Sequence, residues 1–227
     1  MFNASEVTTV KARHRSALAL AGIAAGLALV ATPAQVSAQG MSGRTPPPDA
    51  PRIMVPALRG SEKNVGVQAA DAIRSRLNQD VPFKQLYVLP KTDIVAMLEA
   101  SGYNPNEPLP PNDAKELAKL LRADEYLEGS VTKGPSGFRI ESRLVLARDN
   151  SLVQPLPPVE GSRLDLAAKA LSNELQNARK QLEAERTCVR LAREGKFREA
   201  ATAAQAGIAA YPQSTLARNC QMQAYSQ

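Results

Sequence analysis

Tryptophan is absent from this 227-residue sequence, histidine occurs once, and the aromatic residues are limited to four phenylalanines and five tyrosines. The shortage of histidine matters most, because general bases, proton shuttles and zinc ligands are most often histidines. Few aromatic side chains are available for stacking on nucleic-acid bases. Hydrophobic residues at 44% and charged residues at 22% are still globular proportions, and the length suits one domain or one domain with a small appendage.

The first forty residues have the pattern of an export signal. A basic segment at residues 11–15 precedes an apolar run at residues 17–31, and Val36-Ser37-Ala38 forms an A-x-A-like cleavage site. We therefore predict a signal peptide over residues 1–38, cleaved after Ala38, and a periplasmic or secreted protein. The alternative is an uncleaved membrane anchor, although the apolar run is shorter than the ~20 residues that span a bilayer.

Cleavage would change the chemistry available to the mature chain. It removes His14, so that imidazole metal ligands, Ser-His-Asp triads and Cys-His dyads are all excluded. Three basic residues and one acidic residue are lost with the signal, which lowers the formal net charge of +6 by two, to +4. Cys188 and Cys220 would enter an oxidising compartment, where an even number of cysteines is usually bridged.

The mature chain opens with a leader and continues as alternating strands and helices. Residues 39–51 are rich in proline and glycine and predict a flexible leader. Short apolar or alternating runs predict strands at residues 53–55, 85–89, 126–133 and 138–148, the last two as a hairpin. Residues 151–161 contain three prolines and predict at most a short edge strand.

Helical periodicity occupies the segments between these strands and the whole C-terminal region. One helix is predicted at residues 65–78, a second from a cap at Thr92 to Gly102, and a third that opens with a capping box of Asp113 and Glu116. After Ser162 the pattern is helical, with apolar residues three and four apart as far as Leu182. The order predicts an α+β fold, an α/β sandwich with helices on a small mixed sheet (residues 52–160), followed by a helical tail (residues 161–227).

The region between residues 93 and 131 resembles the TolB-like N-terminal domains of bacterial envelope proteins. In that family a helix ending in ALGAD leads into a Tyr-hydrophobic-x-Gly-Ser-Val strand, and residues 121–124 (Leu-Arg-Ala-Asp) and 126–131 (Tyr-Leu-Glu-Gly-Ser-Val) match. The resemblance covers about residues 52–156. It implies a small periplasmic domain that binds other proteins or assembles, with no family catalytic site. Gly129 within the match would leave room for a helix or strand that crosses closely.

The tail resembles one tetratricopeptide unit. Residues of its helix-turn-helix consensus are matched at Leu191, Gly195, Phe197, Ala200, Tyr211 and Pro212. Ala184 and Ala204 replace bulky aromatic residues of that consensus, and only one full unit and the first helix of another, residues 213–225, fit. Because solenoids usually need three or more units, the resemblance implies a C-terminal helical hairpin of tetratricopeptide type rather than a complete peptide-binding array.

The repeat register also bears on the two cysteines. Cys188 and Cys220 fall near the middle of equivalent, neighbouring helices, so the resemblance implies that a disulfide between them is geometrically permitted. They are 32 residues apart, and closing that loop would contribute ~3–4 kcal/mol in the chain-entropy model. The alternative is a pair of buried, reduced cysteines.

Patterns of catalytic chemistry are few. Ser130-Val-Thr-Lys133 satisfies the S-x-x-K pattern of penicillin-binding enzymes, but it lies on a predicted strand and its companion elements are missing, so we interpret it as chance. Asp124, Glu125 and Glu128 are close in sequence, yet strand alternation separates Glu125 from the other two, which favours a solvated rim over an acid/base pair or a metal site. No nucleotide-phosphate motif is present. We predict no catalytic residue, metal site or cofactor.

Basic residues of the tail are interleaved with acidic ones. The basic set is Arg179, Lys180, Arg186, Arg190 and Arg193, and the acidic set is Glu174, Glu183, Glu185 and Glu194. This arrangement predicts a mixed-charge, solvated helix face and no nucleic-acid partner.

The leading hypothesis is therefore an exported bacterial envelope protein that acts as a non-enzymatic protein-binding or assembly module. Its expected partners are envelope proteins bound through the helical tail or a sheet edge; the sequence specifies neither partner residues nor an oligomeric state. One alternative is an envelope hydrolase that uses carboxylates or Ser130 and Lys133. Another is a structural subunit anchored in the membrane by an uncleaved N-terminal helix.

Overall fold

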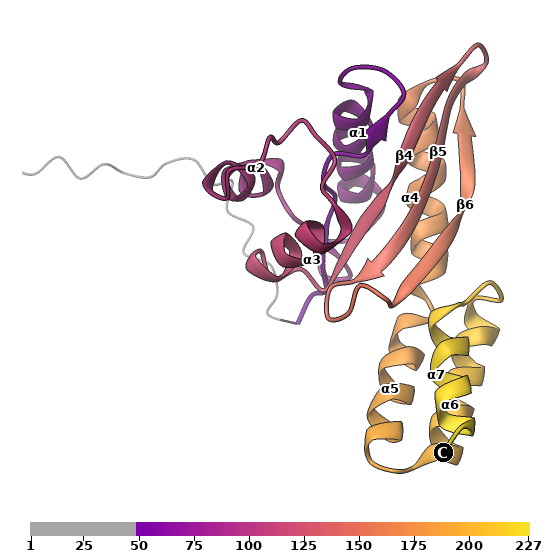
Figure 1. Cartoon of the computed structure of the whole chain (residues 1–227). Helices are drawn as coiled ribbons and strands as arrows, with labels where there is room; N and C mark the ends of the chain where they lie inside the picture. The colour runs from indigo at the N-terminus through magenta and orange to yellow at the C-terminus, as the bar shows by residue number, and fades with distance from the viewer. Residues whose placement is uncertain (1–48) are drawn as a thin grey trace, which may run out of the picture. The chain divides into compact units, whose positions relative to one another are not determined.

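The computed structural model describes residues 49–227 (Figure 1). The predicted signal peptide, its cleavage site at Ala38, His14 and nearly all of the predicted leader lie outside these residues. In the part that is described, no helix combines the length and the apolar character that crossing a membrane requires.

A mixed sheet of six strands organises the fold, with a main path in the order β3-β1-β4-β5-β6. The short strands β1 (Arg52–Met54), β2 (Arg59–Gly60) and β3 (Tyr87–Val88) pair in parallel, β1 with β3 and both β1 and β2 with β4 (Glu125–Gly134). The long strands β4, β5 (Gly137–Leu146) and β6 (Val153–Gly161) are antiparallel. The predicted small mixed sheet of an α+β fold is confirmed.

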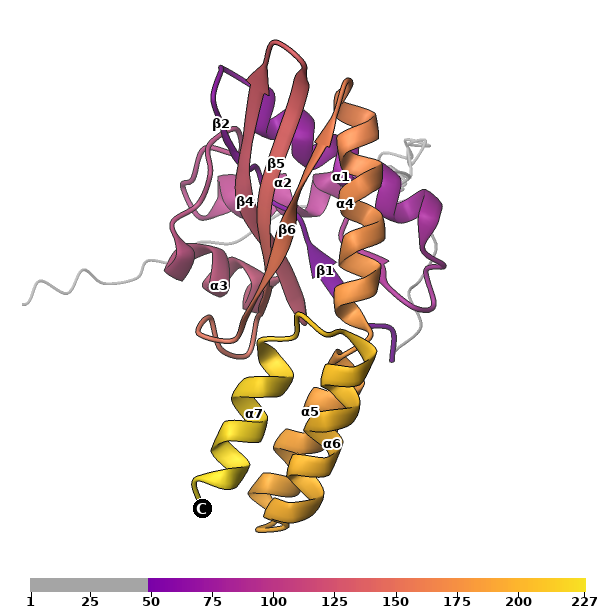
Figure 2. The same cartoon turned by 90° about the vertical axis from the view of Figure 1, so that its right-hand side faces the viewer.

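Helices cover both faces of this sheet (Figures 1 and 2). On one face α1 (Val65–Asp80) and α4 (Leu164–Arg179) bury Ile73, Leu77, Leu171 and Leu175 together with strand residues such as Leu127. On the other face α2 (Lys91–Ala100) and α3 (Pro111–Leu120) enclose a second core that contains Met54 and Tyr126. The sequence pattern groups α4 with the tail, but in the structure α4 completes the core of the α/β domain.

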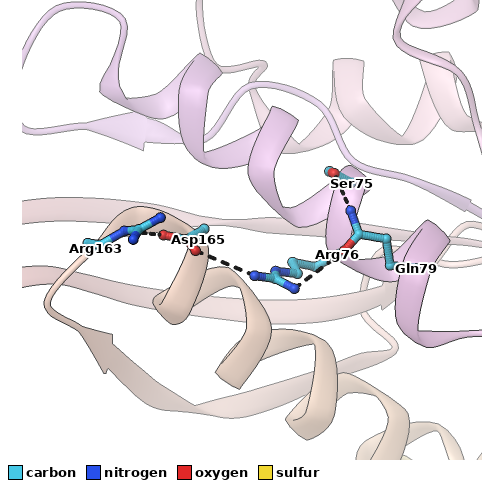
Figure 3. Close-up of polar contacts among 5 residues, drawn as sticks. All are labelled: Ser75, Arg76, Gln79, Arg163 and Asp165. Atoms are coloured by element: carbon cyan, nitrogen blue, oxygen red, sulfur yellow. Dashed lines mark hydrogen bonds and ion pairs between the residues drawn. The ribbon is translucent and has the colours of Figure 1, made fainter.

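A row of polar side chains also joins α1 to α4 at the surface (Figure 3). Asp165 accepts a 3.0 Å hydrogen bond from Arg163 and pairs with Arg76 at 3.4 Å. Gln79 accepts from Arg76 at 3.4 Å and donates to Ser75 at 3.1 Å. These groups are exposed or half-buried, so the apolar core rather than this row holds the two helices together.

Strand β6 is longer than its prolines predicted. Seven of its nine residues pair with β5, and the other two, Pro157 and Pro158, lie at a register shift opposite Glu141. Because β6 is the edge strand of the sheet, it has no neighbouring strand on its outer side whose backbone hydrogen bonds a proline would interrupt. Proline is also tolerated at β-bulges. The prediction of an edge strand is confirmed, and the prediction of a short one is wrong.

Two predicted capping side chains do not cap their helices. The residues that precede α2 and α3 are Pro90 and Pro110, and neither helix has a side-chain capping bond. Thr92 and Asp113 lie inside the first turns, because the helices begin earlier than the capping patterns indicated. Gly102 does follow the end of α2, with φ 77°, in the left-handed conformation that suits glycine.

Gly129 of β4 has the crowded position that its motif implied. A Cβ atom there would lie 2.3 Å from the carbonyl oxygen of Glu141 and 2.9 Å from Cα of Ser142, both on the neighbouring strand β5. Only glycine therefore permits this approach of the two strands.

The tail contains α5 (Leu182–Arg193), α6 (Phe197–Ala210) and α7 (Leu216–Tyr225), beyond the end of the sheet where β6 begins (Figure 2). The helical pattern predicted to continue to Leu182 is broken at residues 180–181, where α4 ends before α5 starts. The tail core consists of small side chains: Cys188, Ala200, Ala201, Ala204, Cys220 and Ala224. Such side chains each bury little apolar area, so other connections carry more of the tail's stability.

Candidate functional site: a cleft between the sheet and the tail helices

Arg148, just after β5, reaches across to α5. Its guanidinium donates to Oε1 of Glu185, whose side chain is only 1% exposed, whereas that of Arg148 is 38% exposed. The second carboxylate oxygen, Oε2, is buried and has no hydrogen-bond partner within residues 49–227. Burial raises the pKa of Glu185, against the opposing influence of Arg148 and of the nearby Arg186 and Arg193.

A hollow of about 410 Å³ surrounds this pair. It lies between the end of α3, the start of β4, the end of β5 and the start of α5. We name it the charged hollow. Its charged lining residues are Lys119, Arg122, Asp124, Glu125, Arg148, Glu185 and Arg186. Most of its functional groups are therefore guanidinium, ammonium or carboxylate groups.

A second hollow of about 630 Å³ lies between the segment after β5 and the tail helices. Arg148 lines it as well as the charged hollow. Its other walls are more apolar and include Leu152, Val189, Ala192 and Phe197, with Gln223 of α7. We name it the helix hollow, and the two hollows together the cleft.

The acidic groups of the cleft are bound by neighbouring groups, whereas several basic groups are not. Glu185 is held by Arg148, and Asp149 accepts a 2.9 Å hydrogen bond from the backbone N–H of Ser151, which lowers the pKa of Asp149. In the described part of the chain, no ion pair involves the exposed residues Arg122, Arg186 and Arg193. The charged hollow as a whole has four basic side chains against three acidic ones in its lining, so its excess of positive charge is small and comes from Arg122 and Arg186.

Arg122 has an unusual backbone conformation. Its φ is 54°, in the left-handed region, directly after the end of α3 and its C-cap Leu121. Glycine is the usual residue at such a position, because a side chain there costs free energy. The resembled motif ALGAD has its glycine at this point, so the arginine is a departure from the motif.

Buried polar side chains fix the tail helices to the sheet. Oε1 of Gln154, in β6, accepts from Nε2 of Gln181 at 3.0 Å and from the backbone N–H of Thr215 at 2.8 Å. Oε1 of Gln181 accepts from the hydroxyl of Ser214, which itself accepts the N–H of Ala217, in the first turn of α7, at 2.9 Å. A buried network with its members paired specifies one arrangement, here that of the tail on the sheet.

A buried ion pair gives a second connection. Arg179 at the end of α4 binds both carboxylate oxygens of Glu125, with distances of 2.8 to 3.0 Å, and the two side chains are 13% and 2% exposed. The predicted solvated position of Glu125 is wrong, because strand alternation turns this residue toward α4. The predicted solvated face of the tail is likewise wrong for Arg179 and Glu185, although Arg190 and Glu194 do form an exposed pair at 2.8 Å.

The three neighbouring carboxylates do not act as a unit. Asp124 accepts the backbone N–H of Arg52 at 2.8 Å, and Glu128 is only 14% exposed and pairs with Arg143 at 2.6 Å. Each carboxylate thus has its own partner. Across residues 49–227, no group of three or more Cys, His, Asp or Glu side chains is placed to hold a metal ion.

Ser130 and Lys133 are not arranged as a nucleophile and its base. They lie three residues apart on β4, so their side chains leave the strand on opposite faces. The ammonium group of Lys133 instead lies 3.3 Å from the carboxylate of Glu62. The serine and lysine of the hydrolase hypothesis are therefore not brought together.

Cys188 of α5 and Cys220 of α7 lie side by side in the buried core of the tail. A disulfide joins them in the structure, with Cα atoms 6.4 Å apart. Formation of this bond in the exported protein remains a prediction.

Sequence reasoning named neither Arg148 nor Gln154, and it assigned Glu185 to a solvated face. A signal for Glu185 was present, because Leu182, Glu185 and Cys188 are spaced three apart and form the buried stripe of α5. A glutamate on such a stripe needs a partner, and that partner belongs to a segment 37 residues earlier. Gln154 carried no comparable signal, since it lies in a proline-rich strand.

No family model and no curated protein matches the chain. Among solved structures, LpoB from E. coli is similar over 70% of this chain and 93% of LpoB, with 13% identity and a TM-score of 0.38. TolB from Acinetobacter baumannii is similar over 59% of this chain and 29% of TolB (14% identity, TM-score 0.37). Lipoprotein GNA1162 from Neisseria meningitidis is similar over 48% and 77% (18% identity, TM-score 0.37). At these TM-scores the likenesses identify neither a family nor a function for the chain.

Proposed function

We propose that this chain is an exported envelope protein that acts without catalysis, as a protein-binding or assembly module, and that a protein partner binds in the cleft. The observation that carries the proposal is the fixed junction between sheet and tail. The network around Gln154 and Gln181 and the pair of Arg179 with Glu125 hold the two walls of the cleft in place. A preformed cleft loses little conformational entropy on binding. The export signal in the sequence supports the envelope location.

The edges of the sheet are poorer binding surfaces than the cleft. An added strand would need backbone N–H donors along β6, but Pro155, Pro157 and Pro158 lack them. The opposite edge strand, β3, has only two residues. We therefore assign partner binding to the cleft rather than to a sheet edge.

We further assign the tail to the tetratricopeptide type. The helices α5 and α6 are joined by a short turn that contains Gly195 at φ 74°, and Tyr211 is buried after α6. In this assignment α5 and α7 are the equivalent helices of successive units. Both contribute to the helix hollow, through Ala192 and Gln223 respectively, which supports a role for the tail in binding.

A matched pair of alanine-to-tryptophan variants tests the binding surface. Ala192 lines the helix hollow, whereas Ala206 is exposed on α6 outside the lining of the cleft. Ala192→Trp should fill the hollow, and the exported chain carrying it should lose proteins that the unchanged chain retains from an envelope extract. Ala206→Trp, at equal thermal stability, should retain them. Identical sets of retained proteins for both variants would contradict the proposal.

The location of the protein is tested separately. N-terminal sequencing of the chain isolated from the cell envelope should begin at Gln39, because cleavage is predicted after Ala38. Sequence that begins at or near Met1 would instead support the anchored alternative.

A further inference from the structure

We propose that the charged hollow binds an acidic peptide segment of a protein partner. In this arrangement Arg122 and Arg186 bind carboxylates of the segment. The Glu185 side chain turns so that Oε2, which is shielded from solvent in the free chain, accepts a backbone N–H of the segment. The inference rests on the proposed function and specifies the chemistry of the partner.

The first support is the position of Arg122. Its left-handed backbone favours glycine, yet the chain has an arginine that lines the hollow and forms no ion pair within residues 49–227. Its backbone N–H donates to Lys119 at 3.0 Å, but no hydrogen bond or ion pair of its guanidinium is found in residues 49–227, so the strained position is a candidate for a functional role. Its guanidinium can bind a carboxylate through two parallel hydrogen bonds.

The second support is the incomplete pairing of Glu185. Oε1 holds Arg148 in the wall of the hollow, while Oε2 is buried without a donor in the described chain. A buried acceptor without a partner destabilises the fold, because its hydrogen bond to water is lost and not replaced. A ligand that supplies an N–H would remove this cost, so the site favours a ligand with donors as well as negative charge.

A peptide satisfies both requirements better than a phosphate group does. A fully ionised phosphate offers only acceptors and would place its charge beside the carboxylate of Glu185. An extended acidic peptide has an N–H at each residue and carboxylates on its side chains, which matches Glu185 together with Arg122 and Arg186. The hollow, at about 410 Å³, is within the usual size range of ligand sites.

Binding of a fluorescein-labelled hexaglutamate peptide to the exported chain, residues 39–227, tests the proposal. Arg122→Gln and Arg186→Gln should each weaken binding about tenfold, since a charge-assisted hydrogen bond contributes about 1.5–3 kcal/mol and 1.4 kcal/mol is a factor of ten. Arg198→Gln removes the same charge from an exposed position of α6 outside the lining of the cleft and should change binding less than about twofold. Labelled hexaglutamine, which keeps the backbone but lacks charge, should bind about tenfold more weakly or not at all.

A further probe tests the role of Glu185. A short polyacrylate with six carboxylates has the side-chain charge of hexaglutamate but no amide N–H, and it should bind more weakly to the unchanged chain. With Glu185→Gln, which replaces one acceptor oxygen by a donor, the two probes should bind with closer affinities. Equal affinity of the two probes for the unchanged chain would show that Oε2 accepts nothing from the ligand.

Several outcomes would overturn the proposal. The first is that the chain does not bind hexaglutamate, and the second is that Arg198→Gln weakens binding as much as Arg186→Gln does. The third is that the chain binds phosphatidylglycerol vesicles instead of the peptide and that Arg186→Gln abolishes this vesicle binding. The proposed function would survive such a failure if Ala192→Trp still loses retained proteins, because that variant fills the helix hollow and leaves the charged hollow unchanged.

Discussion

Gln181, in the turn between α4 and α5, donates a 3.0 Å hydrogen bond to Gln154 of β6, and both side chains are buried. The same oxygen of Gln154 accepts the backbone N–H of Thr215 just before α7. One side chain of the sheet therefore contacts the residues that precede both α5 and α7. This relationship sets the position of the tail, and with it the width of the cleft.

Loss of Gln154 should loosen the tail. Gln154→Ala leaves Nε2 of Gln181 and the N–H of Thr215 without their shared acceptor, which should lower the free energy of unfolding by about 2–4 kcal/mol. Gln79→Ala, which removes an exposed glutamine of α1, should change it by less than about 0.5 kcal/mol. Urea unfolding measures both values, and hydrogen exchange should show lower protection in α7 for Gln154→Ala alone. Equal exchange in the two variants would argue against the anchoring role.

The stability of the protein should depend on pH through Glu185. Its pKa is raised from 4.5 by burial, so the folded chain holds this proton more tightly than the unfolded chain does. The contribution of Glu185 to stability is therefore full below pH 4.5 and falls as the pH rises through the raised pKa. Glu185→Gln cannot ionise, so its Tm relative to the unchanged protein should increase from pH 4.5 to neutral pH.

Calorimetry at several pH values measures this difference. For a domain of this size ~1 kcal/mol corresponds to about 2–4 °C in Tm, so the effect is within reach of the method. Glu183→Gln, at an exposed position two residues earlier on α5, is the matched control. For Glu183→Gln we expect a Tm difference that does not vary with pH. The same result for Glu185→Gln would show that ionisation of Glu185 does not lower the stability of the fold.

Arg122 should lower stability through its backbone conformation. Arg122→Gly relieves the side-chain penalty at φ 54° and should raise the free energy of unfolding by about 0.5–1 kcal/mol. Arg122→Ala keeps a Cβ atom in the left-handed region and should not give this gain. Chemical denaturation of the three proteins decides the matter, and equal stability of the glycine and alanine variants would remove the argument from strain.

The disulfide should stabilise a tail whose core is made of small side chains. Replacing Cys188 and Cys220 together by alanine should lower the stability of the tail by ~3–4 kcal/mol in the chain-entropy model for a separation of 32 residues. Hydrogen exchange in α5 and α7 measures the effect. Thiol quantification of denatured protein from the envelope should find no free thiol, and two free thiols would refute the bond.

Local patterns were sufficient for the outline of the fold but not for its junctions. Alternation and helical periodicity located the long strands and most helices, because each depends on which face of an element is buried. Thr92 and Asp113 were misassigned as caps because the N-cap positions belong to Pro90 and Pro110, two and three residues earlier. The length of β6 was underestimated because an edge position tolerates prolines that a central strand would not.

The candidate site depends on long-range partners and was largely hidden in the sequence. Glu125 was assigned to solvent because its partner, Arg179, lies 54 residues later. Glu185 was assigned to a solvated face, although its spacing from Leu182 and Cys188 placed it on the buried stripe of α5. Mixed charges along a helix indicate solvation only when they avoid the buried stripe, and that condition can be checked in a sequence.

Contact with a partner inside the cleft is the central claim, and site-specific photocrosslinking in cells that export the full chain tests it most directly. A photoreactive p-benzoylphenylalanine in place of Lys119, an exposed lining residue that is given no role in binding, lies in the charged hollow, and the same residue at position 198 lies outside the lining of the cleft on α6. We predict a crosslink to a protein partner at position 119 and none at position 198. No crosslink at position 119, or equal crosslinks at both positions, would contradict the account.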